Sequence, residues 1–210
     1  MNDCEGIPPR GNVREHRNGR PCSSGKPACW LALFCLVSIV GHASAADPQP
    51  LSESQIKAGF VFNFTRFVDW PSSAFATPAS PFLVCILGAA PIAALLAETA
   101  AGKEVSGRRL TIKSKKPTDE LRGCQVLYLG AIEERQEILV LEIVNGSNAL
   151  TVSEIHGFAP AGGMIGFVVQ ENKVKLEINL EATKHAGLKV SSKLIAVSRL
   201  VSRDSALGAN

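Results

Sequence analysis

Apolar residues recur at helical spacing in the segment that follows Ser52. Ser52 and Gln55 form a capping-box pattern, which predicts the start of a helix. Pro71 disfavours helical backbone at the residue before it, so this helix should end near Asp69. At about 100° per residue, one broad arc of the helix is apolar and predicts a core-facing side. That arc contains Ile56, Phe60, Val61, Phe64, Phe67 and Val68.

One aromatic residue of this helix, Phe62, lies outside the apolar arc. It falls on the side of Arg66 and Asp69. An aromatic residue beside an arginine on a surface is typical of binding hot spots. Two interpretations of Phe62 and Arg66 therefore remain open, which are core packing and a partner-binding surface that also includes Asp69.

Beyond Pro81, short apolar runs alternate with helical segments. The run at 82–88 is continuously apolar and the run at 124–130 is apolar except for Gln125, as in buried strands. The order of elements indicates a largely parallel sheet with helices packed on it. The expected strands are 82–88, 109–114, 124–130 and 149–152, and the expected helices are 91–102 and 133–144, with a helical turn at 118–121.

The last third of the chain has a different pattern. Residues 164–169 and 174–180 predict two strands, and strict alternation in the second indicates an antiparallel hairpin with one wetter face. A short helix is expected at 181–185, and Ser191 should cap a final helix that extends to Leu200. The predicted fold class is therefore a single-domain α/β fold. Its mixed sheet is largely parallel, ends in an antiparallel hairpin and carries helices packed on it.

The first 45 residues have the composition of an export signal. A basic region precedes a thirteen-residue apolar run at 28–40, and Ala43-Ser44-Ala45 supplies small residues before a cleavage site at Ala46. Thirteen residues are short for a membrane span, which needs about 20. We therefore expect a cleaved signal peptide at 1–45, a linker at 46–51, one folded domain at 52–201 and a flexible tail at 202–210.

Removal of this leader changes the composition of the chain. The leader holds 5 of the 22 basic and 3 of the 19 acidic residues, so the mature chain has 17 minus 16, or a net charge of +1. This balance gives no electrostatic reason to expect nucleic acid or an anionic membrane as a partner. Four of the six cysteines also leave, so Cys85 and Cys124 remain. Two cysteines in an exported domain favour one disulfide, with a metal site or a catalytic thiol as alternatives.

The mature chain contains few signals of catalysis. Residues Gly162-Gly163-x-x-Gly166 lack the lysine of a phosphate loop and precede a strand rather than a helix. The chain has no Gly-x-Ser-x-Gly elbow, no His-Glu-x-x-His pair and no paired-carboxylate motif. We therefore predict no catalytic residue, no metal site and no cofactor.

Two small groups of polar residues are candidates for binding. Glu154 and His156 lie in a loop after a strand, where α/β sheets place ligand sites, although such a pair is also common by chance. Lys113, Lys115 and Lys116 form a small basic patch after another strand. This patch is either a solvated edge or a surface for an acidic partner.

Eight short segments, taken together, are similar in sequence and order to one known family. They cover nearly all of 52–201 and lie at 56–71, 84–88, 123–128, 150–153, 157–159, 162–165, 177–180 and 186–194. In these segments the chain resembles the YfiR-like periplasmic proteins. The resemblance implies a periplasmic regulator rather than an enzyme.

The resemblance also implies a class of partner. Family members repress an inner-membrane diguanylate cyclase of the YfiN type by protein contact, which lowers cyclic-di-GMP. An outer-membrane lipoprotein of the YfiB type can sequester the repressor, and other members accompany different membrane sensor proteins. A homodimer is a further assembly that the sequence leaves open, and the rival function is that of a periplasmic small-molecule-binding protein.

The cysteines fit this family only in part. Cys85 and Cys124 match the family's first disulfide pair. Ala159 and Gly166 stand near the places where some members carry a second pair. The resemblance therefore implies that any link between redox state and repression rests on a single bond in this chain.

Overall fold

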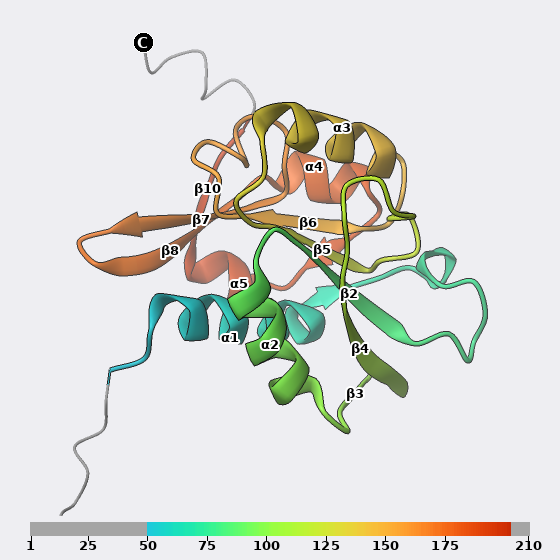
Figure 1. Ribbon diagram of the computed structural model, residues 1–210. Helices are drawn as coiled ribbons and strands as arrows, with labels where there is room; N and C mark the ends of the chain where they lie inside the picture. The colour runs from blue at the N-terminus through green and yellow to red at the C-terminus, as the bar shows by residue number, and fades with distance from the viewer. Residues whose placement is uncertain (1–49, 203–210) are drawn as a thin grey trace, which may run out of the picture. The chain divides into compact units, whose positions relative to one another are not determined.

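The computed structural model describes residues 50–202. The predicted signal peptide, most of the linker and most of the tail lie outside these residues. Within them, helices cover both faces of a central sheet (Figure 1). The helices are α1 (Glu53–Phe67), the 3-10 turn η1 (Ser72–Ala74), α2 (Ala90–Ala100), α3 (Glu134–Val144), α4 (Leu180–His185) and α5 (Ser192–Ala196).

The described strands form an eight-stranded sheet in the order β10-β8-β7-β6-β5-β2-β4-β3 and a separate pair, β1-β9. Strands β4, β2, β5, β6 and β7 are parallel, whereas β8 runs antiparallel to β7 and β3 antiparallel to β4. The predicted fold class is therefore confirmed. The strands are β1 (Val68–Asp69), β2 (Phe82–Leu87), β3 (Glu104–Val105), β4 (Arg108–Ser114), β5 (Val126–Leu129), β6 (Leu150–Ser153), β7 (Ile165–Gln170), β8 (Lys173–Ile178), β9 (Lys189–Val190) and β10 (Ser198–Leu200).

The two faces of the sheet bury different side chains. Because side chains alternate along a strand, Val84 and Ile86 of β2 point towards α1 and α2, whereas Cys85 and Leu87 point towards α3. Figure 1 shows α1, α2 and α5 on one side of the sheet and α3 on the other. The larger cluster of buried residues lies on the side of α1 and α2.

Helix α1 begins where the capping box predicts. The backbone N–H of Gln55 donates to Ser52 Oγ at 3.2 Å, and the N–H of Ser52 donates to Gln55 Oε1 at 2.7 Å. The helix ends at Phe67, two residues before the predicted end, because the next two residues leave the helix and pair with β9 as β1. Phe64 is fully buried, and its ring centroid lies 6.1 Å from that of Phe167 on β7.

The structure differs from the predicted elements in the last helix, in the turn at 118–121 and in three short strands, β1, β3 and β9, that the sequence did not predict. The final helix ends at Ala196, and Ser198–Leu200 form β10, which pairs with β8. The apolar residues expected on one helical face therefore divide, with Leu194 buried and Val197 and Leu200 exposed. The predicted helical turn at 118–121 is not helical. The expectation of helix up to Leu200 was wrong because pairing with the sheet edge overrides local helical spacing.

Candidate functional site

The three residues of the predicted partner surface lie at the carboxyl-terminal half of α1 and on β1. Arg66 and Asp69 are exposed. Phe62 is half-buried, packs against the core, and has Nζ of Lys103 4.7 Å from its ring centroid. The helical-wheel expectation for Phe62 was therefore only partly right, because α1 packs against α2 as well as the sheet. Arg66 and Asp69 are the exposed members of this surface.

This end of α1 is held firmly to the rest of the fold. Val68 pairs with Val190, and the N–H of Ser191 donates to the carbonyl of Phe67 at 2.9 Å. Trp70 Nε1 donates to the carbonyl of Gln125 at 3.0 Å. Arg66 and Asp69 therefore project from an anchored backbone, which lowers the entropic cost of presenting them to a partner.

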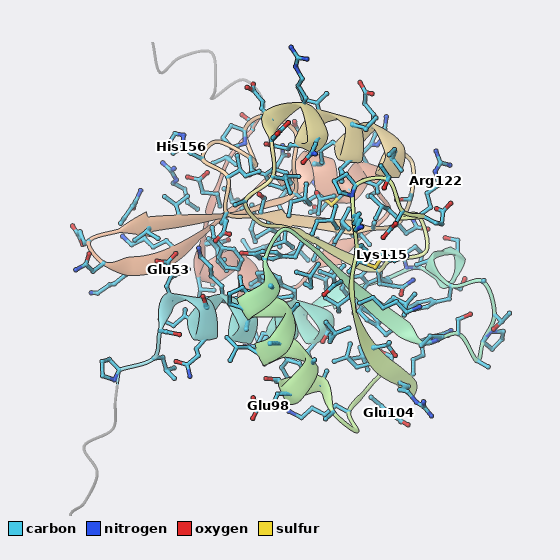
Figure 2. All side chains as sticks on the ribbon, in the orientation of Figure 1. Glu53, Glu98, Glu104, Lys115, Arg122 and His156 are labelled. Carbon is cyan, nitrogen blue, oxygen red and sulfur yellow. A yellow bond between two sulfur atoms is a disulfide. The ribbon has the colours of Figure 1, made fainter. Side chains whose placement is uncertain are left out.

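The other predicted pair, Glu154 and His156, follows β6. Glu154 forms an ion pair with Lys57 of α1, whereas His156 is exposed in a turn. Figure 2 shows His156 at the surface of this loop and Glu53 at the start of α1. Glu154 is thus committed to a contact between α1 and the sheet.

Lys57 is the centre of a polar cluster that the sequence interpretation missed. Its side chain is only 7% exposed, and Nζ lies 2.5 Å from Glu53 Oε1 as well as beside Glu154. Burial lowers the pKa of the Lys57 ammonium, but hydrogen bonds to Glu154 and Glu53 and their negative charges outweigh burial, so the net shift is upward. A lysine four residues after a glutamate suggests an exposed helical pair, and nothing in the sequence identifies the third member.

Tyr128 of β5 has a buried hydroxyl close to this cluster. Among the described residues this hydroxyl makes no hydrogen bond within ordinary distance and angle limits, although it lies near enough to the Glu154 carboxylate for the two groups to interact. Burial, followed by the negative charge of Glu154, raises the pKa of Tyr128. A buried polar atom without a partner costs stability, so the cluster is not fully optimised for folding.

The carboxyl ends of the central strands are closed by backbone contact. Strand β2 pairs with β4 on one side and β5 on the other, which is the point where open α/β sheets usually form a ligand crevice. Here the N–H of Gly130 donates to the carbonyl of Leu87 at 2.7 Å. A Cβ atom at Gly130 would lie 2.6 Å from Ala89 Cβ and 2.7 Å from the carbonyl oxygen of Gly88. The usual crevice is therefore filled by main chain at this position.

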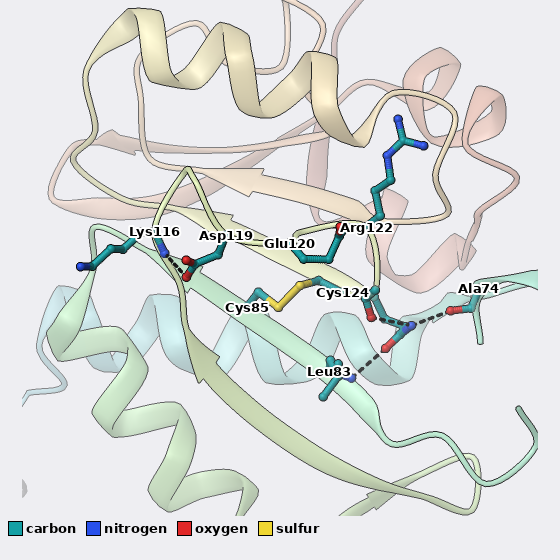
Figure 3. The surroundings of a disulfide bond; sticks show 10 residues. Ala74, Leu83, Cys85, Lys116, Asp119, Glu120, Arg122 and Cys124 are labelled. Carbon is teal, nitrogen blue, oxygen red and sulfur yellow. Dashed lines mark hydrogen bonds between the residues drawn. A yellow bond between two sulfur atoms is a disulfide. The ribbon is translucent and has the colours of Figure 1, made fainter. Parts of the chain in front are cut away.

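The disulfide joins Cys85 of β2 to Cys124, which stands just before β5. Their Cα atoms are 5.9 Å apart, and both side chains are buried on the α3 side. The buried side chain of the next residue, Gln125, accepts from the N–H of Leu83 at 2.7 Å and donates to the carbonyl of Ala74 at 2.6 Å (Figure 3). A covalent bond and an amide side chain thus tie the start of β5 to β2 and the loop before it.

A comparison with known protein families decides the identity of the chain. The family model described as YfiR/HmsC-like matches residues 54–199, which is more than half of the chain. The chain belongs to the YfiR/HmsC-like family. The matched region contains Arg66 and Asp69, the ion pair of Lys57 with Glu154, and the disulfide.

Family membership places this YfiR/HmsC-like protein among periplasmic regulators of cyclic-di-GMP signalling. It also implies a regulatory partner associated with a membrane. Within residues 50–202, no helix is both long and apolar enough to cross a membrane.

Two cavities open on the surface of the described region. One of about 630 Å³ lies between α3, α4 and the loop at 161–164, and the other of about 560 Å³ lies between the end of α2 and β4. Neither is lined by Glu154 or His156. The predicted ligand pair therefore lies outside both of these cavities, and the larger of the two is lined by Asn179 and His185.

Proposed function

We propose that this protein represses a membrane-bound diguanylate cyclase by binding its periplasmic region through the carboxyl-terminal end of α1. Membership of the YfiR/HmsC-like family is the observation that carries this proposal. The contact lowers cyclic-di-GMP by holding the cyclase in an inactive state. A YfiB-type lipoprotein would relieve repression by competing for the same protein.

The contact surface combines two exposed charges with an aromatic side chain. Arg66 can form two parallel hydrogen bonds with a carboxylate of the partner, and Asp69 can accept from its donors. Phe62 supplies apolar area below Lys103, which shields part of its ring in the free protein. Because the backbone here is anchored by β1 and Trp70, binding orders few additional groups.

A double substitution tests this surface directly. Arg66→Ala with Asp69→Ala should raise cellular cyclic-di-GMP to the level of a deletion strain, because the exposed contacts are lost while the fold keeps its core. A matched control is Glu171→Ala with Lys173→Ala at the exposed tip of the β7–β8 hairpin, which also removes one acid and one base.

Three measurements complete the experiment. Periplasmic protein levels and thermal melting must match the wild type for both double variants. Phe62→Ala should give an intermediate rise in cyclic-di-GMP, because the ring is only partly accessible. Full repression by a stable Arg66→Ala, Asp69→Ala variant would exclude this surface as the point of contact.

Small-molecule binding is a second candidate function, favoured by the 630 Å³ cavity. Its walls combine apolar side chains such as Met164 with polar ones such as Asn179, as is common in ligand sites. A thermal-shift screen of amino acids and nucleotides tests this function. A ligand that raises the melting temperature of the wild type should lose its effect in a Met164→Trp variant, which fills the cavity.

A further inference from the structure

The outer edge of β4 is only partly covered. On one side β4 pairs with β2 from Leu110 to Ser114, but on the other side β3 pairs only with Arg108 and Arg109. In the part of the chain that the structure describes, no other strand pairs along this edge. Figure 1 shows β4 at the edge of the sheet next to α2, with β3 at its beginning only.

The printed hydrogen bonds show which main-chain groups face outwards. The N–H of Leu110 donates away from β2 to the carbonyl of Lys103 at 2.9 Å, whereas the N–H of Lys115 donates to the carbonyl of Ile86 in β2 at 2.9 Å. Main-chain groups of successive residues point to opposite sides of a strand. Ile112 and Ser114 therefore direct both N–H and C=O to the open side, where another strand could pair.

A groove runs beside this open edge. The cavity of about 560 Å³ lies between the end of α2 and β4. On the α2 side its wall consists of small residues such as Ala97, Ala101 and Gly102, and on the β4 side it includes Leu110 and Ile112. The same groove is also lined by polar residues, among them Lys103, Glu104 and Thr111. An extended segment beside β4 would thus place every second side chain against a wall of small apolar and polar residues.

Basic side chains predominate along the edge of β4. Near β3, Glu104 lies opposite Arg109, and Lys103 and Arg108 are two further basic residues of this region. At the carboxyl end of β4 the basic patch of Lys113, Lys115 and Lys116 continues the open edge. Figure 2 shows Glu98 and Glu104 at the β3 end of this region and Lys115 away from them. The positive end favours acidic side chains in a partner strand.

We propose that β4 and its basic patch form a second interaction surface, which binds an extended acidic segment of a partner protein as an added strand. The segment pairs with Ile112 and Ser114, places small apolar side chains in the groove, and directs its acidic side chains to Lys113, Lys115 and Lys116. This is strand addition, in which main-chain hydrogen bonds give affinity and alternate side chains give specificity. The surface differs from the Arg66 and Asp69 surface, so the two proposals fail independently.

Amide hydrogen exchange, followed by NMR, tests this proposal at single residues. The protein is purified in its exported form from the periplasm and mixed with an acetylated peptide of alternating glutamate and alanine or valine. The amides of Ile112 and Ser114 should exchange quickly in the free protein and about tenfold more slowly with saturating peptide. A peptide with lysine in place of glutamate, and a scrambled acidic peptide, should give no protection.

Two substitutions separate the main chain from the charge. Ile112→Pro removes an outward main-chain donor and leaves the hydrogen bonds between β4 and β2 in place. It should weaken binding of the acidic peptide at least about fivefold, whereas Ile112→Val should bind the peptide like the wild type. Lys113→Glu should also weaken binding of the acidic peptide, and the loss of affinity should be greater at low salt than at high salt. Lys189→Glu, an exposed lysine on β9, is the charge control.

Three outcomes would overturn the proposal. Unchanged exchange with every peptide would mean that the lysines only protect a free edge from pairing. Protection that grows with protein concentration in the absence of peptide would identify a second copy of this chain as the occupant. Wild-type affinity in both Ile112→Pro and Lys113→Glu would place the peptide elsewhere.

Discussion

The two faces of the sheet are stabilised by different means. On the α1 and α2 side, aromatic rings pack in a chain in which the centroid of Phe167 lies 6.0 to 6.2 Å from those of Phe60, Phe64 and Tyr128. On the α3 side the buried residues are mostly aliphatic, the cluster is smaller, and Cys85 and Cys124 are joined covalently. Packing dominates one face, and a bond that reductants can break reinforces the other.

The two faces therefore differ in how their stability responds to pH and to redox conditions. Apolar packing changes little with redox state or with pH near neutrality. A disulfide depends on the redox state of the compartment, and a buried ion pair depends on pH. The α1 side also contains the Lys57 cluster, so each face combines packing with one group that the environment can titrate or reduce.

The largest effect is expected from a substitution that disrupts aromatic packing on the α1 and α2 side of the sheet. Phe64→Ala should lower the free energy of unfolding by about 3–5 kcal/mol, because a fully buried ring leaves a cavity against Phe60 and Phe167. Urea denaturation measures the loss. Ile138→Ala on the exposed side of α3 is the control and should change stability by less than about 0.5 kcal/mol. Equal losses in the two variants would refute the packing described for α1.

Removal of the covalent bond tests the other face. Cys85→Ser with Cys124→Ser should lower the free energy of unfolding by about 2–4 kcal/mol, since the bond closes a loop with a sequence separation of 39. The same loss should follow when dithiothreitol is added to the wild type. We also expect weaker repression and higher cyclic-di-GMP in this variant. A wild type that is indifferent to reductant in urea denaturation would contradict the role assigned to the bond.

A smaller effect is expected from the ion pair. Lys57→Met should cost about 1–2 kcal/mol, because Glu154 loses its partner but stays 30% exposed to water. The pKa of Lys57 is raised in the folded state, so the contribution of the charge is complete below its ordinary value of 10.5 and is lost as the pH rises through the folded pKa. The difference in unfolding free energy between Lys57→Met and wild type should therefore shrink when denaturation is repeated at increasingly alkaline pH above 10.5. Lys57→Met with Glu154→Gln should recover part of the loss at neutral pH.

The smallest effect on stability is expected from a substitution of Tyr128, on the α1 and α2 side of the sheet. Tyr128→Phe removes a buried hydroxyl without a hydrogen-bond partner among residues 50–202. Stability should stay the same or rise by up to about 1 kcal/mol, because the desolvated polar atom is gone and the ring remains. A loss of more than about 1 kcal/mol in thermal or urea denaturation would show that the hydroxyl has a partner after all.

Most elements of the fold could be predicted from local patterns in the sequence. The capping box at Ser52 located the start of α1, and the runs around Cys85 and Leu127 identified buried parallel strands. Such features could be predicted because the residues that decide them are neighbours in the chain. Strand β10 could not, since Ser198–Leu200 become a strand only by pairing with β8.

The candidate site was less predictable than the fold. Arg66 of α1 and Asp69 of β1 are exposed, but the partial burial of Phe62 depends on α2 and Lys103. Lys57 lies 97 residues from Glu154, and no local pattern encodes a contact over that separation. The open edge of β4 likewise follows from the shortness of β3, which has no sequence signal of its own.

The close approach at Gly130 has a consequence for how this sheet can change over evolution. Position 130 has no room for a side chain, because even one added methyl group would clash with Ala89 and Gly88. The bond between Cys85, within β2, and Cys124, just before β5, links the same two strands at a second place. Because β2 and β5 are held together at both places, they have little freedom to separate and form a crevice. New binding sites in this fold therefore arise more easily at the edges of the sheet and on the helices.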